Sequence, residues 1–98
     1  MEMKPKFKLG REVATRSVSE WIDPSGDEGV RYGQVLDCLK RHVSGDWGDV
    51  CSDDAALNDE ALKLGNRILS VYTVDDRVIW IITEADRSST TILFPEEY

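Results

Sequence analysis

Residues 66–83, NRILSVYTVDDRVIWIIT, contain two runs rich in β-branched and aromatic residues, separated by the pair Asp75-Asp76. Runs of this composition favour strands, and a short polar break between two of them is typical of a β-hairpin. Residues 78–82 are apolar at both alternating positions, which indicates a central strand with both faces covered. The stretch therefore predicts an antiparallel hairpin in the middle of a sheet.

Further strands are predicted on both sides of this hairpin. Residues 90–94 form a run of threonine and apolar residues that Pro95 ends, because proline cannot donate to a strand ladder. The polar residues 85–89 before it predict a turn. Residues 6–14 show a weaker pattern that allows one short strand. Together these runs predict a three- or four-stranded antiparallel meander.

The pattern before the hairpin is helical. Residues 31–43 predict a helix because apolar side chains recur there at helical spacing and form one stripe: Tyr32, Val35, Leu36, Leu39 and Val43. Asp37 and Arg41 are placed for an i,i+4 ion pair on the opposite face. We expect the pair Ser44-Gly45 to end this helix.

A second helix is predicted over residues 53–64, with Ser52 as its N-cap and Gly65 as the left-handed residue that ends it. Its expected buried side chains share one face: Leu57, Ala61 and Leu64. Asn58 falls within the same apolar arc, where a buried amide has to find hydrogen-bond partners. We expect it to bond to loop or strand backbone.

A short third helix is predicted near the start of the chain. Residues 17–20, SVSE, match a capping box, in which a serine and a glutamate satisfy each other's backbone N–H groups. The glycines and proline of residues 23–29 then indicate a loop. The predicted fold class is α+β, with two or three helices packed on a three- or four-stranded antiparallel meander.

The 98 residues fit one domain, 1–98, in which we expect residues 1–5 to be frayed. The net charge of −7 repels nucleic acid at long range and attracts basic surfaces, so direct nucleic-acid binding is not expected. No apolar run is suited to a signal peptide or a membrane span. Since Cys38 and Cys51 stand apart, with no zinc-ligand spacing, they indicate reduced thiols and a cytoplasmic protein.

An acidic segment runs from the end of the first main predicted helix into the second. Residues 43–60 carry six acidic residues and no basic one: Asp46, Asp49, Asp53, Asp54, Asp59 and Glu60. Charge runs are typical of a solvated face, and they also suit a surface that binds a positively charged partner. A calcium site is a third alternative, but the spacing of these acids does not match an EF-hand loop.

Three of these acids have an expected structural role within the predicted helix. Asp53 and Asp54 fall in the first turn of the predicted helix, where each stabilises the helix dipole by about 0.3–1 kcal/mol. Asp59 can pair with Lys63 at i,i+4. Asp46, Asp49 and Glu60 have no such explanation: these three are the stronger candidates for a partner surface.

Trp47 and His42 each allow a structural and a functional interpretation. Trp47 lies between Gly45 and Gly48, where it could pack in the core or contact a partner as interface aromatics do. His42 is the single histidine and borders the apolar stripe. A catalytic role for it needs a nucleophile or carboxylate directed at the ring.

The polar turn after the central strand is the other candidate site. Glu84, Asp86 and Arg87 follow that strand, and loops placed on rigid strands often carry function. Their side chains could equally hydrogen-bond within the turn itself. Together with His42, these residues define an alternative class: a small enzyme or ligand-binding domain.

Two segments carry a resemblance: RHVSGDWGD at residues 41–49, and IWIITEADRSSTTILFPEEY at residues 79–98. They resemble a family of short bacterial proteins carried on plasmids and other mobile elements, as does FKLG at residues 7–10. Residues 16–30 depart from that pattern. The family has been linked to type I restriction enzymes, but this chain has no Rossmann unit or glycine-rich cofactor turn of a methyltransferase.

The resemblance brings no established activity. Small acidic proteins of mobile elements suggest a non-enzymatic inhibitor instead, by analogy with anti-CRISPR and antirestriction proteins that present carboxylates in place of DNA phosphates. The expected partner is a basic DNA-binding surface of a CRISPR or restriction complex in the bacterial cytoplasm. The predicted contact residues are Asp46, Trp47, Asp49, Asp53, Asp54 and Glu60. We expect no cofactor, no metal and a monomer or homodimer; a role in plasmid maintenance is a further alternative.

Overall fold

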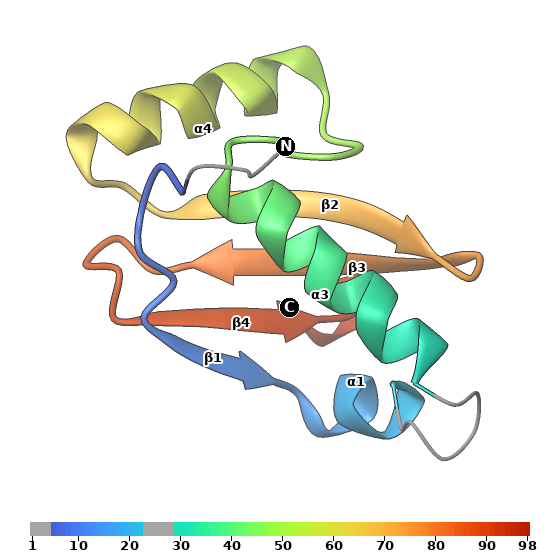
Figure 1. Cartoon of the computed structure of the whole chain (residues 1–98). Coiled ribbons are helices and arrows are strands. Elements are labelled where there is room, and N and C mark those ends of the chain that lie inside the picture. The colour runs from blue at the N-terminus through green and yellow to red at the C-terminus, as the bar shows by residue number, and fades with distance from the viewer. Residues whose placement is uncertain (1–4, 23–28) are drawn as a thin grey trace.

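The computed structural model describes residues 5–22 and 29–98, which form a four-stranded sheet with helices around it (Figure 1). Two predictions fall largely outside the described residues: the frayed start, for residues 1–4, and the loop at residues 23–29, for residues 23–28. The elements in chain order are β1 (Arg11–Ala14), α1 (Arg16–Trp21), α3 (Val30–Val43), α4 (Ser52–Leu64), β2 (Ile68–Val74), β3 (Arg77–Thr83), β4 (Ser89–Leu93) and the 3₁₀-helix η1 (Pro95–Glu97). The fold class is α+β, as predicted.

The sheet has the order β1-β4-β3-β2 and is mixed. β2, β3 and β4 form the predicted antiparallel meander, but β1 pairs in parallel with β4, from Arg11 opposite Ser89 to Ala14 opposite Ile92. The prediction of a fully antiparallel sheet is therefore wrong for β1. Parallel strands need a long crossover connection, and here the described elements between β1 and β4 are α1, α3, α4, β2 and β3.

The hairpin between β2 and β3 forms where it was predicted. Asp75 and Asp76 both adopt left-handed backbone angles, with φ of 49° and 61°. Two such residues match the twist of antiparallel strands, and aspartate tolerates this conformation better than most residues. β3 lies between β2 and β4, and its residues Ile79, Ile81 and Ile82 are buried, which confirms the predicted central strand.

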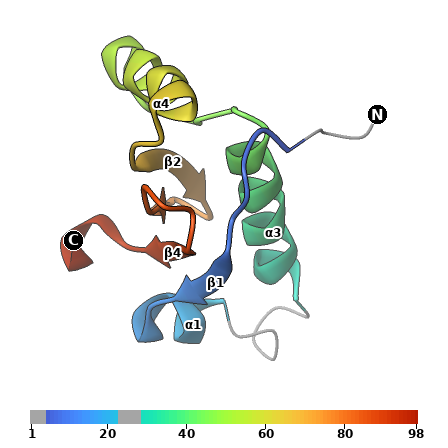
Figure 2. The same cartoon turned by 90° about the vertical axis from the view of Figure 1, so that its left-hand side faces the viewer.

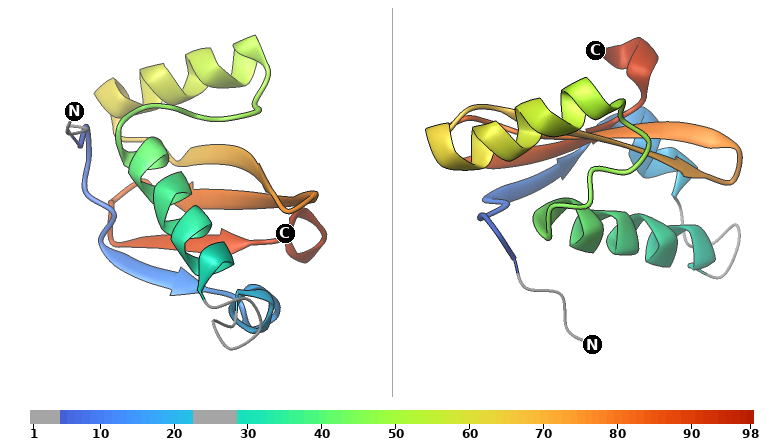
Figure 3. Two further views of the ribbon diagram at one scale, coloured as in Figure 1. Left: turned by 45° about the vertical axis from the view of Figure 1, so that its right-hand side comes forward. Right: turned by 90° about the horizontal axis from the view of Figure 1, so that it is seen from above.

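α3 covers one face of the sheet (Figures 1 and 3). The residues of its buried face are Val35, Cys38, Leu39 and His42. The predicted stripe was rotated from this face, because Tyr32 and Leu36 remain 48% and 37% exposed. The predicted and the observed buried faces both have helical spacing. They differ because Cys38 and His42 are buried, although neither belongs to the predicted apolar stripe.

α1 follows β1 directly and begins one residue before the predicted capping box. Thr15 is its N-cap, and the Thr15 hydroxyl accepts a hydrogen bond from the backbone N–H of Val18 at 3.3 Å. The capping box predicted at Ser17 is therefore wrong. Starting at Arg16 places Val18 fully inside the core cluster under α3.

α4 lies along the β2 edge of the sheet (Figures 1 and 3). Gly65 ends it with φ of 74°, as predicted, but Cys51 rather than Ser52 is the N-cap residue. Ala61 and Asn58 are the buried side chains, whereas Leu57 and Leu64 are 62% and 63% exposed. The predicted apolar face is wrong for both leucines.

Candidate functional site

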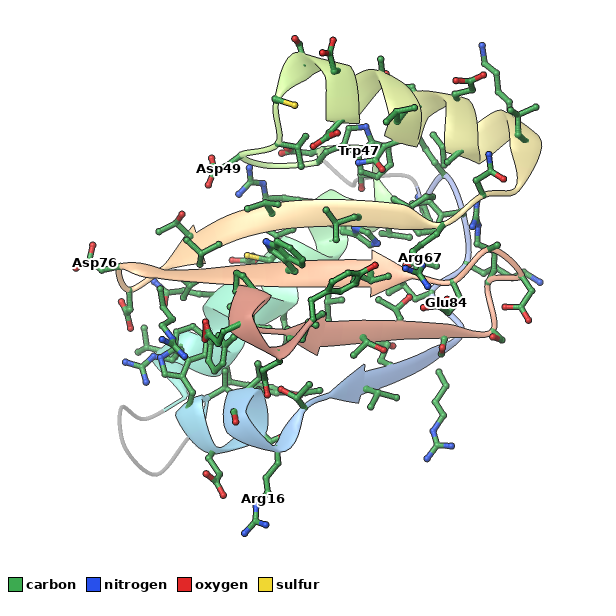
Figure 4. All side chains as sticks on the ribbon, turned by 180° about the vertical axis from the view of Figure 1, so that it is seen from behind. Arg16, Trp47, Asp49, Arg67, Asp76 and Glu84 are labelled. Carbon is green, nitrogen blue, oxygen red and sulfur yellow. The ribbon has the colours of Figure 1, made fainter. Side chains whose placement is uncertain are left out.

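The acidic segment runs through the loop after α3 and along α4 as far as Glu60. All six of its carboxylate residues are exposed. Figure 4 shows Asp49 in the loop beside β2, while Trp47 lies between α4 and β2. The structure thus brings the predicted acids onto one side of the molecule, beyond the β2 edge.

This loop is held against β2 by backbone contacts. The Asp49 N–H donates to the Val71 carbonyl at 2.7 Å, and the Val71 N–H donates to the Trp47 carbonyl at 3.1 Å. Gly48 lies between them with φ of 75°, and a Cβ at this position would lie 1.9 Å from the Val71 oxygen. Only glycine fits both the backbone angle and the close approach.

Three of the six acids are engaged within the protein. Asp46 forms an ion pair with Arg41, whose Nε lies 2.8 Å from Oδ2, and this hydrogen bond holds the pKa of Asp46 below its usual value. Asp49 accepts from the Thr73 hydroxyl at 3.1 Å. Asp59 accepts from the indole N–H of Trp47 at 3.0 Å.

These contacts replace the two ion pairs predicted along the helices. Arg41 pairs with Asp46 instead of Asp37, and Asp59 bonds to Trp47 instead of Lys63. The loop packs against both helices, so Asp46 reaches Arg41 of α3 and Trp47 reaches Asp59 of α4.

The other three acids are Asp53, Asp54 and Glu60. Within the described part of the chain, their side chains make no hydrogen bond or ion pair, and all three are exposed. Asp53 and Asp54 lie in the first turn of α4, as predicted, and keep their carboxylates free of side-chain partners. The expectation that Asp46 and Asp49 lack a structural role is wrong, because both have partners within the fold. Glu60 alone was predicted correctly to lack a local partner.

The outer surface of α4 has a regular arrangement. Asp53, Leu57, Glu60 and Leu64 follow one another at spacings of four, three and four residues, which places them on one helix face. This acidic α4 face, with Asp54 beside its first turn, combines free carboxylates with two exposed leucines. Sequence reasoning missed the leucines because they had been assigned to the core.

Trp47 belongs to the core. Its side chain is 5% exposed, packs in one cluster with Ala61 and Ile68, and stacks with Phe7 at a centroid distance of 6.3 Å. The structure supports the packing interpretation of Trp47. A partner could reach its ring only if the loop left β2.

His42 is fully buried at the centre of a hydrogen-bonded chain of side chains. Its Nδ1 lies 2.6 Å from the Ser70 hydroxyl and its Nε2 lies 2.8 Å from the Thr83 hydroxyl. Thr83 and Thr90 are 2.7 Å apart, and Thr90 donates to the Leu9 carbonyl at 2.6 Å.

The carbonyl at the end of this chain determines the direction of each bond, because it can only accept. Thr90 uses its hydrogen on Leu9 and so accepts from Thr83, which in turn accepts from Nε2 of His42. Nε2 therefore carries a hydrogen. Burial lowers the pKa of His42 to about 4, so the ring is neutral near pH 7, and Ser70 donates to the unprotonated Nδ1.

The turn after β3 is also occupied by internal contacts. Arg87, with φ of 60°, donates to four backbone carbonyls, those of Asn66, Glu84, Ala85 and Ala61. Glu84 pairs with Arg67 at 3.4 Å, and the two lie side by side in Figure 4. The Asp86 carboxylate accepts from the Ser88 N–H at 3.0 Å. Hydrogen bonds from the Ser88 side chain and then from this N–H lower the pKa of Asp86.

The residues of the alternative site are therefore held by internal contacts. Phe7 lies against both parts, with its ring 5.2 Å from the His42 ring and 5.6 Å from the Arg87 guanidinium carbon. Both ring nitrogens of His42 are bonded to hydroxyl groups of the core, and the guanidinium of Arg87 ties the turn to the end of α4.

Comparisons with known protein families, with curated proteins and with solved structures found no match to this chain. Among residues 5–22 and 29–98, no group of three or more histidine, cysteine, aspartate or glutamate side chains is placed to hold a metal ion. Within the same residues, no helix has the length and apolar character needed to cross a membrane.

Proposed function

We propose that this chain is a non-enzymatic binding protein that inhibits a bacterial defence complex of the CRISPR or restriction type. In this proposal, the acidic α4 face occupies a basic surface that otherwise binds DNA. The observation that carries the proposal is the set of carboxylates on Asp53, Asp54 and Glu60, which are exposed and have no partner within the described chain.

The charge density of this face suits the proposed target. Each strand of duplex DNA carries about one charge per 3.4 Å of axis. Helix residues rise about 1.5 Å each, so Asp53, Asp54 and Glu60 span roughly 10 Å of α4, a similar spacing to that of the phosphates of one strand. Asp54 adds a third charge to the first turn, while Asp46 and Asp49 extend the same acidic surface into the loop. The net charge of −7 adds long-range attraction toward a basic partner.

The exposed leucines give this face a second property. Leu57 and Leu64 supply apolar area between the carboxylates, and interfaces gain most of their stability from such buried centres. Charges at the rim then set the rate of association and its sensitivity to salt. We expect inhibition to weaken as salt rises.

The alternative of a small enzyme built on His42 has less support. The ring is fully buried, neutral and bonded at both nitrogens, so it offers no free position for a substrate. Arg87 is likewise committed to backbone carbonyls.

The test is DNA binding and cleavage by purified CRISPR and restriction complexes in the presence of the full chain. The variant D53N/D54N/E60Q removes the three free carboxylates, and we expect it to weaken inhibition about tenfold or more, since each lost contact costs roughly 0.5 kcal/mol. Inhibition by this variant equal to that of the unaltered chain refutes the role of the α4 face.

The matched control removes three charges elsewhere. Glu20, Asp37 and Asp76 are exposed and lie on α1, on α3 and at the hairpin tip. The variant E20Q/D37N/D76N should inhibit within about twofold of the unaltered chain, apart from the loss of general long-range attraction. If both variants lose inhibition equally, overall charge rather than the α4 face is responsible. If no complex is inhibited, the proposed class of target is wrong.

A further inference from the structure

The two edges of the sheet differ in how their backbone groups are used. At the β2 edge, Asn58 accepts from the Leu69 N–H and donates to the Leu69 carbonyl, at 3.2 and 2.7 Å. Val71 is bonded in the same way by the loop backbone at Trp47 and Asp49. Side-chain and loop contacts therefore close this edge to another strand.

The β1 edge is open. Arg11 and Thr15 direct their N–H groups to β4, bonding to the carbonyls of Ser88 and Ile92 at 3.0 Å. Because neighbouring residues of a strand point their backbone groups to opposite sides, Glu12 and Ala14 point theirs away from β4. Within the described chain, β1 pairs with no strand other than β4, and Figure 2 shows β1 at the outer edge.

A hollow lies beside this open edge, between β1 and α3. Its volume is about 220 Å³, several times the roughly 30 Å³ that one water takes in the liquid. Its lining is mostly apolar, with one charge of each sign: Leu9, Glu12, Leu36, Leu39, Lys40 and Val43. Leu36 is 37% exposed at the hollow, although leucine at such a position on α3 was expected in the core.

The surroundings of the edge are basic, in contrast with the rest of the chain. Residues 5–16 carry Lys6, Lys8, Arg11 and Arg16 against the single acid Glu12. Because Arg16 pairs with Glu20 at 3.1 Å, the positive charge offered near the edge is that of Lys8 and Arg11, together with Lys40 of α3. The net charge of the whole chain is −7. A segment that binds at this edge would therefore meet local positive charge.

We propose that the β1 edge and this hollow bind an extended acidic segment of a partner protein by strand addition. The backbone of the segment pairs with Glu12 and Ala14. Since side chains alternate along a strand, every second side chain faces α3, and an apolar one enters the hollow. Acidic side chains near it contact Lys8, Arg11 or Lys40. This site lies on the edge opposite α4 and does not depend on the function proposed for the α4 face.

The test uses the full chain and a fluorescent, acetylated peptide in which glutamate alternates with leucine or valine. We expect saturable binding, read by fluorescence anisotropy, that weakens as salt rises. Hydrogen exchange at the amides of Glu12 and Ala14 should slow on binding. A peptide N-methylated at alternate residues on the edge-facing side cannot donate these bonds, and its affinity should fall about tenfold or more.

The matched protein variants are Leu36→Glu and Leu57→Glu. Both replace an exposed leucine of a helix, but only Leu36 lines the hollow. L36E should bind the peptide about tenfold more weakly, and L57E should bind it as the unaltered chain does. Circular dichroism and thermal unfolding confirm that both variants are folded.

Several results overturn the proposal. They are the absence of saturable binding, equal affinity of the N-methylated peptide or of L36E, and tighter binding of a peptide with lysine in place of glutamate. Sedimentation of the chain as a dimer that L36E dissociates would identify a second copy as the occupant, and would overturn binding of a partner segment. Slowed hydrogen exchange at the amides of Glu12 and Ala14, together with weaker peptide binding by L36E, supports the proposal.

Discussion

Mild acid should destabilise this protein through one buried side chain. His42 has a pKa of about 4 in the folded chain against the ordinary 6.5, because burial disfavours the charged ring. Protonation would also put a hydrogen on Nδ1, which the Ser70 hydroxyl now approaches as a donor at 2.6 Å. The unfolded chain therefore binds a proton at a higher pH than the folded chain does.

The sign and size of the effect follow from this difference in pKa. The histidine leaves stability undiminished above pH 6.5 and lowers it progressively as the pH falls toward 4. At pH 5 the free energy of unfolding should be lower than at pH 8 by about 2 kcal/mol, with a limiting loss of about 3 kcal/mol in stronger acid. The lowered pKa of Asp46 acts in a lower range, where its carboxylate begins to protonate.

The assay is urea unfolding at pH 8, 7, 6 and 5, followed by tryptophan fluorescence. Trp47 reports on the relevant region because its ring lies 6.0 Å from that of His42. Since His42 is the single histidine of the chain, no other imidazole contributes to this window. The control is His42→Gln, which keeps an amide for hydrogen bonding but does not titrate, and whose stability should be flat from pH 8 to pH 5.

Two results would refute the reasoning. One is a stability of the unaltered chain that does not fall between pH 8 and pH 5. The other is an imidazole that titrates near pH 6.5 in the folded protein, as seen in its C–H resonances by NMR. The second measurement needs no substitution, so it remains decisive if His42→Gln does not fold.

Two predictions concern the closure of the β2 edge. Gly48→Ala should lower the free energy of unfolding by about 2 kcal/mol or more, because its Cβ would clash with the Val71 carbonyl and its φ is positive. Gly33→Ala, in open space on α3, is the control and should raise stability by about 0.5–1 kcal/mol in the same urea titration. Asn58→Ala should cost about 1–3 kcal/mol in thermal or urea unfolding, since both backbone groups of Leu69 lose their partner. An unchanged unfolding midpoint of Asn58→Ala would show that water replaces the hydrogen bonds to Leu69 without loss of stability.

The hairpin and the helices could be predicted from sequence because their causes are local. Asp75 and Asp76 mark the turn by themselves, and the apolar run of β3 indicates a central strand without knowledge of its neighbours. Gly65 likewise ends α4 through its own backbone angle. Such features depend on a few adjacent residues.

The direction of β1 could not be predicted in this way. Glu12 pairs with Thr90, and the distance between them in the chain is most of its length. A four-residue strand with an exposed pattern carries no mark of the direction of its partner. The parallel direction of β1 relative to β4 depends on the crossover through α3, which is a property of the whole fold.

The sequence predicted where the candidate site lies, but not which of its acids are free and which have partners within the protein. The acids of residues 46–60 do gather on one side of the molecule, as their density indicated. Which of them are free depends on contacts across the fold, such as Trp47 with Asp59 and Thr73 with Asp49. Local helical rules assign an acid to a neighbour on its own helix, so they cannot foresee these partners.

The unequal edges of the sheet also limit how copies of this chain can associate. A sheet with two open edges can add copies at both ends and grow into a fibre, which natural proteins avoid by blocking edges. Here Asn58 and the loop at Gly48 block the β2 edge, so any pairing through β1 uses up the one open edge of each copy. Growth by strand pairing would stop at two chains, and loss of both the Asn58 and the Gly48 loop contacts would remove that limit.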